Sequence, residues 1–140
     1  MLYRLFLILV ISASLLSALP AQNPSHEDRI MSIYFGGGSY YIDYDQKVEL
    51  IDFINDIEDL VGYQIEVHGH TDNIGSMVYN RRLSHFRCEA VKDILRELLI
   101  EEETIFQYDH GEENPNFSNE TLQGKLHNRR VDVIIRRLAA

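Results

Sequence analysis

The chain has 140 residues, which is enough for one domain of ordinary size and short for two. Its formal net charge of −9 excludes nucleic acid as a partner, because the sequence has no basic stripe that could displace the counterions of phosphate groups. The single cysteine, Cys88, excludes an internal disulfide, and its position in an apolar helical pattern predicts a small buried side chain.

The first 21 residues predict a cleavable secretion signal. A basic residue, Arg4, precedes the apolar run Leu5–Leu19, and small residues stand at Ala18 and Ala21. The run is shorter than the ~20 residues that a helix needs to cross a bilayer, so we favour cleavage over an uncleaved membrane anchor. No cysteine ends the signal to carry a lipid, which argues against a lipoprotein. We therefore expect the periplasm of a Gram-negative bacterium, with or without association with the outer membrane.

Hydrophobic patterns divide the rest of the chain into a flexible leader over residues 22–29 and one domain over residues 30–138. Apolar and polar residues alternate in the predicted strands, and apolar residues recur at helical spacing in the predicted helices. In chain order we expect a strand at 29–35, a helix at 45–60, a strand at 63–70, a helix at 78–99, a strand at 104–111, a polar loop at 112–126 with room for one helical turn, and a strand at 130–137.

Strands that are joined through helices favour right-handed βαβ connections. Two helices can cover only one face of a sheet, so we expect an α/β fold of two layers. The open face of the sheet would then carry polar residues such as Glu66 and His68. The glycine triplet at residues 36–38 predicts a flexible loop, because it does not open directly into a helix as a phosphate-binding glycine loop does.

Arg87 is the least expected residue of the second predicted helix. Asn80, Ser84 and Arg87 fall on the same helical stripe as the apolar residues of the C-terminal half. A guanidinium on a stripe that faces the core is costly unless an anion meets it. A long side chain near a helix end can also extend its charged head to water. This pattern alone leaves both interpretations open.

A polar strand-to-helix turn at residues 69–75 precedes this helix and places Thr71 and Asp72 near its start. An aspartate and an arginine at the rim of one crevice suit a zwitterionic ligand, whose amine would meet Asp72 and whose carboxylate would meet Arg87. The alternative is that Asp72 and Arg87 pair with each other.

The motifs around this turn resemble the OmpA-like C-terminal domain, which also occurs in peptidoglycan-associated lipoproteins and in MotB-type flagellar stator proteins. Several separated motifs agree with the family in order and spacing, and the resemblance covers roughly residues 30–137. The matching residues are Gly69-His70-Thr71-Asp72, Gly75, Asn80, Leu83-Ser84, Arg87, His110-Gly111-Glu112, Pro115 and Asn128-Arg129-Arg130-Val131. The family implies a mixed four-stranded sheet with two main helices on one face.

The resemblance also implies non-catalytic binding of peptidoglycan through the diaminopimelate residue of its stem peptide. It assigns the ligand's amine to Asp72 and its carboxylate to Arg87. Further pocket positions of the family match Asn80, Thr71, Leu83 and Arg129. No cofactor or metal is implied, and outer-membrane or other envelope proteins are further candidate partners. Two features depart from the family: Cys88 replaces the usual alanine, and the loop at residues 36–41 is unusual and could alter the pocket wall.

Other functions compete with this one. His68 and His70 lie on one face of a strand and His110 could lie nearby, but Zn²⁺ usually takes three or four ligands and no further cluster has ligand spacing. A hydrolase would need Ser84, His70 and Asp72 as a triad, yet Ser84 lies on a helix and not on a nucleophile elbow. The main alternative is a periplasmic structural or protein-interaction module with a degenerate pocket.

Overall fold

The computed structural model describes residues 28–57 and 59–138. The predicted signal peptide and the leader up to residue 27 lie outside the described residues. The elements, in chain order, are β1 (Arg29–Tyr34), α1 (Tyr44–Asn55), β2 (Tyr63–His70), α2 (Met77–Glu97), a short 3-10 helix (Glu102–Thr104), β3 (Ile105–Gly111), α3 (Leu122–Asn128) and β4 (Arg130–Arg137). Within the described residues, no helix has the length and apolar character that crossing a bilayer requires.

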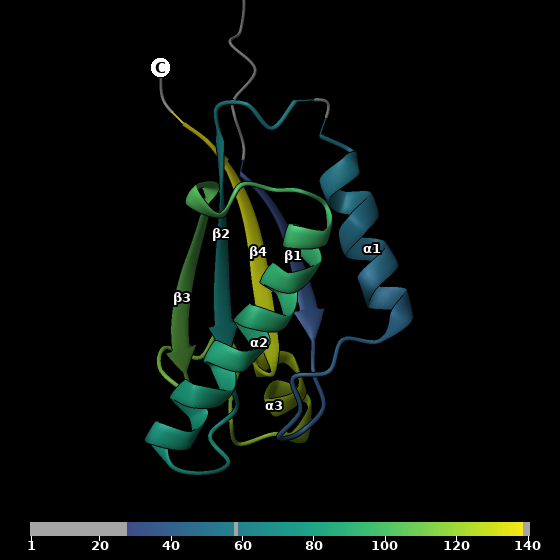
Figure 1. Ribbon diagram of the computed structural model, residues 1–140. Coiled ribbons are helices and arrows are strands. Elements are labelled where there is room, and N and C mark those ends of the chain that lie inside the picture. Colours follow the sequence, from purple (N-terminus) through teal and green to yellow (C-terminus); the bar gives the residue numbers. More distant parts are fainter. Residues whose placement is uncertain (1–27, 58, 139–140) are drawn as a thin grey trace, which may run out of the picture.

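The strands form one mixed sheet in the order β1-β4-β2-β3 (Figure 1). β4 is antiparallel to both of its neighbours, so that Ile135 lies opposite Arg29 of β1 and opposite Ile65 of β2. β2 and β3 are parallel and are joined by α2. The last strand of the chain is therefore inserted between the first two.

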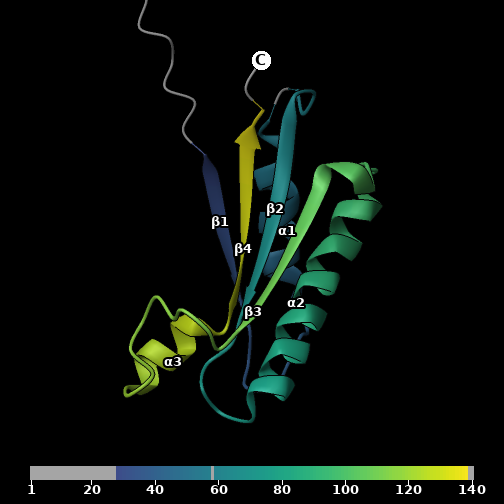
Figure 2. The same cartoon turned by 90° about the vertical axis from the view of Figure 1, so that its left-hand side faces the viewer.

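α1 and α2 lie on the same side of this sheet, whereas α3 lies at one end of it, on the side away from α2 (Figures 1 and 2). The apolar core fills the space between the two main helices and the strands. Its fully buried members include Ile33, Leu50, Val67, Val91 and Val133. The predicted α/β fold, with a mixed four-stranded sheet and two main helices on one face, is confirmed.

Both main helices begin at a residue that caps them. The side chains of Asp43 and Ser76 accept hydrogen bonds from backbone N–H groups in the first turns of α1 and α2. The predicted extension of the first helix to residue 60 is wrong, because α1 ends at Asn55. Asn55 and Asp56 have side chains that compete with helical hydrogen bonds, which favours termination there.

The polar loop predicted over residues 112–126 contains the start of a helix, α3. The Thr121 side chain caps this helix. At its other end, the buried Asn128 amide both donates to and accepts from the backbone of Phe117. Polar side-chain bonds, and not apolar periodicity, therefore order this segment, which is why its hydrophobic pattern did not predict a full helix.

α2 packs closely against β2 at Gly69. A Cβ atom at this position would lie 2.5 Å from the carbonyl oxygen of Ser84 and 2.6 Å from Cys88 Sγ, which is closer than packed atoms allow. Cys88 is fully buried, as predicted, and burial raises the pKa of its thiol. This contact fixes the first half of α2 beside the end of β2.

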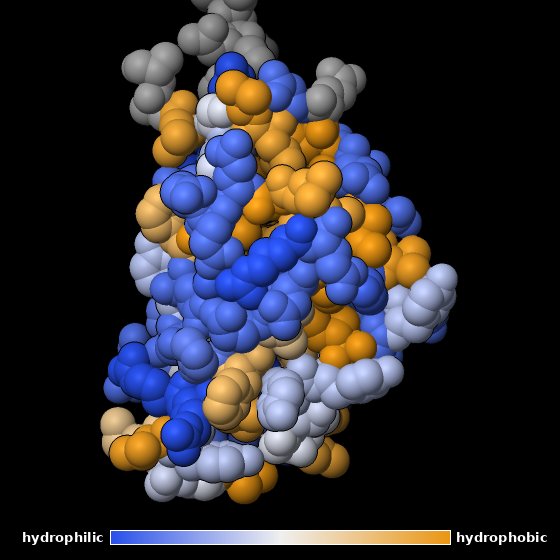
Figure 3. Space-filling view, in the orientation of Figure 1, coloured by the Kyte–Doolittle hydropathy of each residue, from blue (hydrophilic) through white to orange (hydrophobic). Residues whose placement is uncertain are grey.

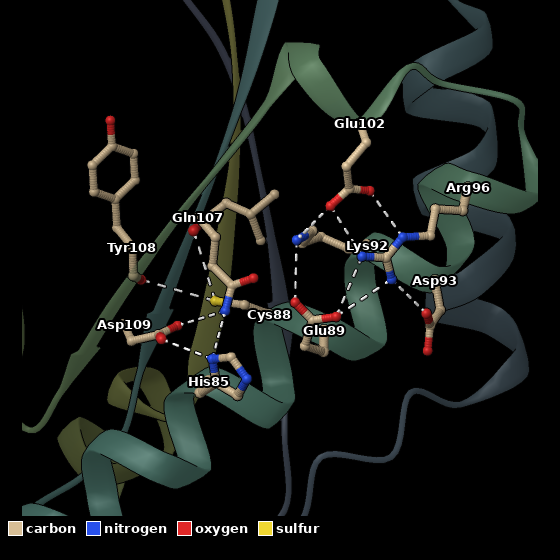
Figure 4. Close-up of polar contacts among 11 residues, drawn as sticks. His85, Cys88, Glu89, Lys92, Asp93, Arg96, Glu102, Gln107, Tyr108 and Asp109 are labelled. Carbon is tan, nitrogen blue, oxygen red and sulfur yellow. Dashed lines mark hydrogen bonds and ion pairs between the residues drawn. The ribbon is translucent and has the colours of Figure 1, made fainter.

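An ion-pair network fixes the second half of α2 to the 3-10 helix before β3 (Figure 4). Arg96 Nε lies 2.9 Å from one carboxylate oxygen of Glu102, and Lys92 Nζ lies 2.8 Å from the other. Glu89 lies 3.1 Å from the same lysine nitrogen. The hydrogen bonds from Arg96 and Lys92 lower the pKa of Glu102 to about 2. Together with the Gly69 contact, these pairs fix α2 over β2 and β3.

The sheet face opposite the helices is less open than predicted. Glu66 does lie on this face, but only 6% of it is exposed. Its carboxylate accepts hydrogen bonds from Arg136 and Gln64 and lies 3.1 Å from His68 Nε2. The expectation that Glu66 would be solvent-exposed is therefore wrong, because neighbouring long polar side chains cover it.

Candidate functional site

A small pocket lies where β2 ends and α2 begins. Its volume is about 160 Å³. Its wall combines the loop after β1, the turn after β2, the first half of α2 and the residue before β4. The wall residues are Gly37, Gly38, Asp72, Ile74, Tyr79, Leu83, Arg87 and Arg129. Four of the six predicted site residues thus line one cavity.

Arg87 is fully buried, so the interpretation in which its charged head reaches water is wrong. Its guanidinium also lies 5.0 Å from the centre of the Phe35 ring, a cation–π contact. Three backbone carbonyl oxygens accept hydrogen bonds from this guanidinium, those of Ser39 (2.8 Å), His70 (2.8 Å) and Gly36 (3.0 Å). Arg87 therefore links the loop after β1 to the end of β2.

Asp72 pairs with Arg129, and not with Arg87. Asp72 Oδ2 lies 2.6 Å from Arg129 Nε, and Oδ1 accepts a hydrogen bond from the backbone N–H of Ile74. The two paired side chains are only 8% and 14% exposed. Burial lowers the pKa of Arg87 to about 10, and the negative charge of Asp72 opposes this shift. The pocket thus contains one carboxylate and two guanidinium groups.

Thr71 and Asn80 are not among the residues that line the pocket. The Thr71 hydroxyl donates to the backbone carbonyl of Asp72 at 2.8 Å. Asn80 is fully buried, and its Nδ2 donates to the Glu112 carboxylate, while its Oδ1 has no hydrogen-bond partner within the described residues. Thr71 therefore bonds within the turn that carries Asp72, whereas Asn80 connects the start of α2 to Glu112, which follows β3.

The remaining wall residues were not part of the predicted site, namely Gly37, Gly38, Ile74 and Tyr79. Gly38 has a φ of 65°, a left-handed conformation that favours glycine, and a Cβ atom on it would lie 3.3 Å from the Tyr79 hydroxyl. The glycine triplet was the available sequence signal. It predicts a loop, and the departure of residues 36–41 from the family indicates that this loop could alter the pocket wall, but no local pattern places the loop against α2.

The contacts of the described residues also bear on the two other functions considered above, a metal site and a hydrolase. In the part of the chain that the structure describes, no three His, Cys, Asp or Glu side chains are grouped so that they could bind a metal ion. Ser84 is fully buried, and its hydroxyl donates to the Arg81 carbonyl at 2.8 Å and accepts from the Gly111 N–H at 3.0 Å. These bonds hold α2 against the end of β3 and give the hydroxyl a structural role.

Three histidines stack on the face of the sheet opposite the helices. His68 Nδ1 lies 2.9 Å from His110 Nε2, and the nearly parallel rings of His70 and His110 have centres 4.7 Å apart. Burial, together with the positive charges of Arg130 and His110, lowers the pKa of His70 to about 4, and the negative charge of Asp132 opposes this shift.

Acidification is expected to destabilise the fold through His70, by about 3 kcal/mol. Because the folded-state pKa of about 4 lies below the ordinary value of 6.5, this contribution is complete above pH 6.5 and is lost as the pH falls through 4. Urea-unfolding midpoints measured from pH 7 to pH 4 test this. His70→Gln should flatten the profile relative to the unmodified chain, and an equally steep profile in the variant would contradict the assignment.

The chain is similar in sequence to several known proteins. The OmpA family matches residues 34–129, which is more than half of the chain. Outer membrane porin F of Pseudomonas fluorescens is 32% identical over 100 residues, covering 66% of this chain and 31% of that protein. Peptidoglycan-binding protein ArfA of Mycobacterium tuberculosis is 35% identical over 72 residues, covering 51% of this chain and 22% of its own length. The chain thus spans about a third or less of the length of these relatives.

Solved structures agree with this match. The peptidoglycan-associated lipoprotein from Burkholderia pseudomallei has a TM-score of 0.70 at 26% identity, over 75% of this chain and 89% of that one. The OmpA-like domain of FopA1 from Francisella tularensis shares the fold, with a TM-score of 0.66 at 20% identity, over 80% of this chain and 75% of that one. The matched range contains all six predicted site residues. The chain therefore belongs to the OmpA family.

Proposed function

We propose that this chain binds peptidoglycan in the periplasm, without catalysing a reaction, through the diaminopimelate residue of the stem peptide. The observation that carries the proposal is that the Asp72 carboxylate and the Arg87 guanidinium line one small pocket. The free end of diaminopimelate carries an amine and a carboxylate on the same carbon, so the two charges of the ligand meet opposite charges of the pocket. The names of two relatives, a peptidoglycan-binding protein and a peptidoglycan-associated lipoprotein, support this partner.

Asp72 is the residue that takes the amine in this proposal. Its carboxylate has two oxygens with about four acceptor positions, of which Arg129 and the Ile74 N–H occupy two. An ammonium group of the ligand can therefore be added without first breaking the existing pair. Thr71 helps to position the turn that carries Asp72 through its bond to the Asp72 carbonyl, and Asn80 connects the start of α2 to Glu112.

Arg87 and Arg129 together take the carboxylate. A guanidinium has five N–H donors, and Arg87 gives three of them to backbone carbonyls, so two are left for a ligand. Arg129 uses Nε for Asp72, and its Nη1 lies along the pocket wall, 3.4 Å from where a Cβ of Gly37 would be. Two cations around one carboxylate compensate for the burial of the ligand's charge.

The size of the pocket fits the end of a side chain and not a whole muropeptide. Pockets that enclose a complete small ligand usually measure about 300–1,000 Å³, against about 160 Å³ here. Leu83 supplies an apolar wall for the methylene groups of the ligand.

Binding is expected to depend on the chemistry of the wall. Lysine-type peptidoglycan lacks the distal carboxylate, so the buried guanidinium of Arg87 would meet no anion of the ligand, at a cost of about 2–5 kcal/mol. Cosedimentation with purified sacculi should therefore show strong binding to diaminopimelate-type walls and at least about thirtyfold weaker binding to lysine-type walls. Equal binding to both walls would contradict the clamp. No binding to either would favour the structural or protein-interaction module.

A further inference from the structure

Four exposed aromatic side chains, here called the aromatic rim, come from the two segments that supply most of the pocket wall, the loop after β1 and the first half of α2: Tyr40 (54% exposed), Tyr41 (74%), Tyr79 (48%) and Phe86 (42%). A cluster of large exposed rings is more often a binding surface than a result of chance exposure. Figure 3 shows the face that carries α1 and α2. Its lower part, where the loop after β1 lies in Figure 1, is largely pale, unlike the deep blue of the charged residues above it.

The aromatic rim continues the wall of the pocket. Tyr79 is part of that wall, and Phe86 follows the wall residue Leu83 by three positions, so both point from the same side of α2. The rings of Tyr40 and Phe86 pack together, with centres 5.5 Å apart. When the end of a ligand lies in the pocket, the part of the ligand just outside the pocket therefore lies beside aromatic rings.

The loop that carries Tyr40 and Tyr41 is held in place before any ligand arrives. Arg87 Nε donates to the carbonyl oxygen of Ser39 at 2.8 Å, and the Tyr41 N–H donates to Ser39 Oγ at 3.0 Å. The buried arginine that lines the pocket thus also anchors the rim. Less conformational entropy is lost on binding when the contact surface is already ordered.

We propose that the aromatic rim binds sugar rings of the glycan strand whose stem peptide occupies the pocket, an inference that rests on the proposed function. The pocket has room only for the end of one side chain of the stem peptide, so the rest of the polymer must lie outside it. None of the four rim residues is charged, whereas the stem peptide carries carboxylates. A pyranose ring presents a flat C–H face bordered by hydroxyl groups, which complements a tyrosine with its apolar ring and polar tip.

Two soluble probes distinguish binding by the aromatic rim from binding by the pocket. One is a diaminopimelate-containing stem tetrapeptide, and the other is the same peptide on its disaccharide. The unmodified chain should bind the disaccharide-peptide about tenfold more tightly than the free peptide in calorimetric titrations. Tyr40→Ala/Tyr41→Ala should remove this difference and leave the affinity for the free peptide within about twofold, and Phe86→Ala should reduce the difference.

Phe106→Ala is the matched control, because Phe106 is a similarly exposed ring (44%) that alternates with the core residue Ile105 and so points away from the helices. It should leave both affinities unchanged. Equal binding of the two probes by the unmodified chain, or an equal loss of both in the double variant, would overturn the proposal. If the rim instead bound a protein, the unmodified chain would bind the two probes equally. Failure of the free peptide to bind at all would instead refute the proposed function.

Discussion

Replacement of Arg87 by leucine is expected to lower the free energy of unfolding by about 3 kcal/mol or more, because three backbone carbonyls would each lose a buried hydrogen-bond donor. Domains of this size are stable by only about 5–15 kcal/mol. The leucine would extend the apolar stripe that contains Val91 and Ile94, but this gain cannot replace the bonds to residues 36, 39 and 70. Urea-unfolding midpoints measure the effect.

Two variants on the same helix control this experiment. Arg82 is exposed, so Arg82→Leu should change the midpoint little. Arg87→Lys keeps the charge but has a compact ammonium that cannot reach three separated carbonyls, so it should also be strongly destabilised. If Arg87→Leu were as stable as the unmodified chain, the three bonds would merely offset the cost of burying the charge, and the stabilising role assigned to them would be wrong.

The sequence predicts much of this fold because the core-facing pattern is strong. The alternation in residues 63–70 gives the bounds of β2 as the structure has them, and the second helix is right to within two residues at each end. In both elements one face is buried against the core, so the pattern is imposed by packing. The C-terminal end of the first helix is predicted five positions too late, because that end depends on local competition by polar side chains.

The site is only partly visible in the sequence. The helical stripe shows that Arg87 needs a partner, but its partners are backbone carbonyls of a loop about 50 positions earlier, and carbonyls leave no trace in a residue pattern. For the same reason the pair between Asp72 and Arg129, 57 positions apart, could not be derived from spacing. The family resemblance placed Arg129 at the pocket without indicating that it neutralises Asp72.

Neutralising both members of this pair is expected to keep the fold and abolish wall binding. Asp72→Asn alone leaves Arg129 without its anion at 14% exposure, and Arg129→Gln alone leaves Asp72 without its cation at 8% exposure. Each single variant should lose about 2–4 kcal/mol of unfolding free energy, somewhat less than a wholly buried pair. The double variant Asp72→Asn/Arg129→Gln has no stranded charge, so it should recover most of that loss. Denaturant midpoints of the four proteins give the coupling free energy.

Binding of the double variant separates a ligand clamp from a structural ion pair. If Asp72 receives the ligand's amine, no carboxylate remains to do so, and affinity for diaminopimelate-type sacculi should fall at least about a hundredfold, because a buried cation then lacks its anion. A purely structural pair predicts the opposite, since a double variant without a stranded charge would keep the fold and with it the pocket and its binding. Wild-type binding by a double variant of recovered stability would therefore remove Asp72 from the ligand site. If the double variant regains its stability but does not bind, unfolding cannot explain the loss of binding. The double variant is therefore a sharper test of the ligand clamp than either single variant.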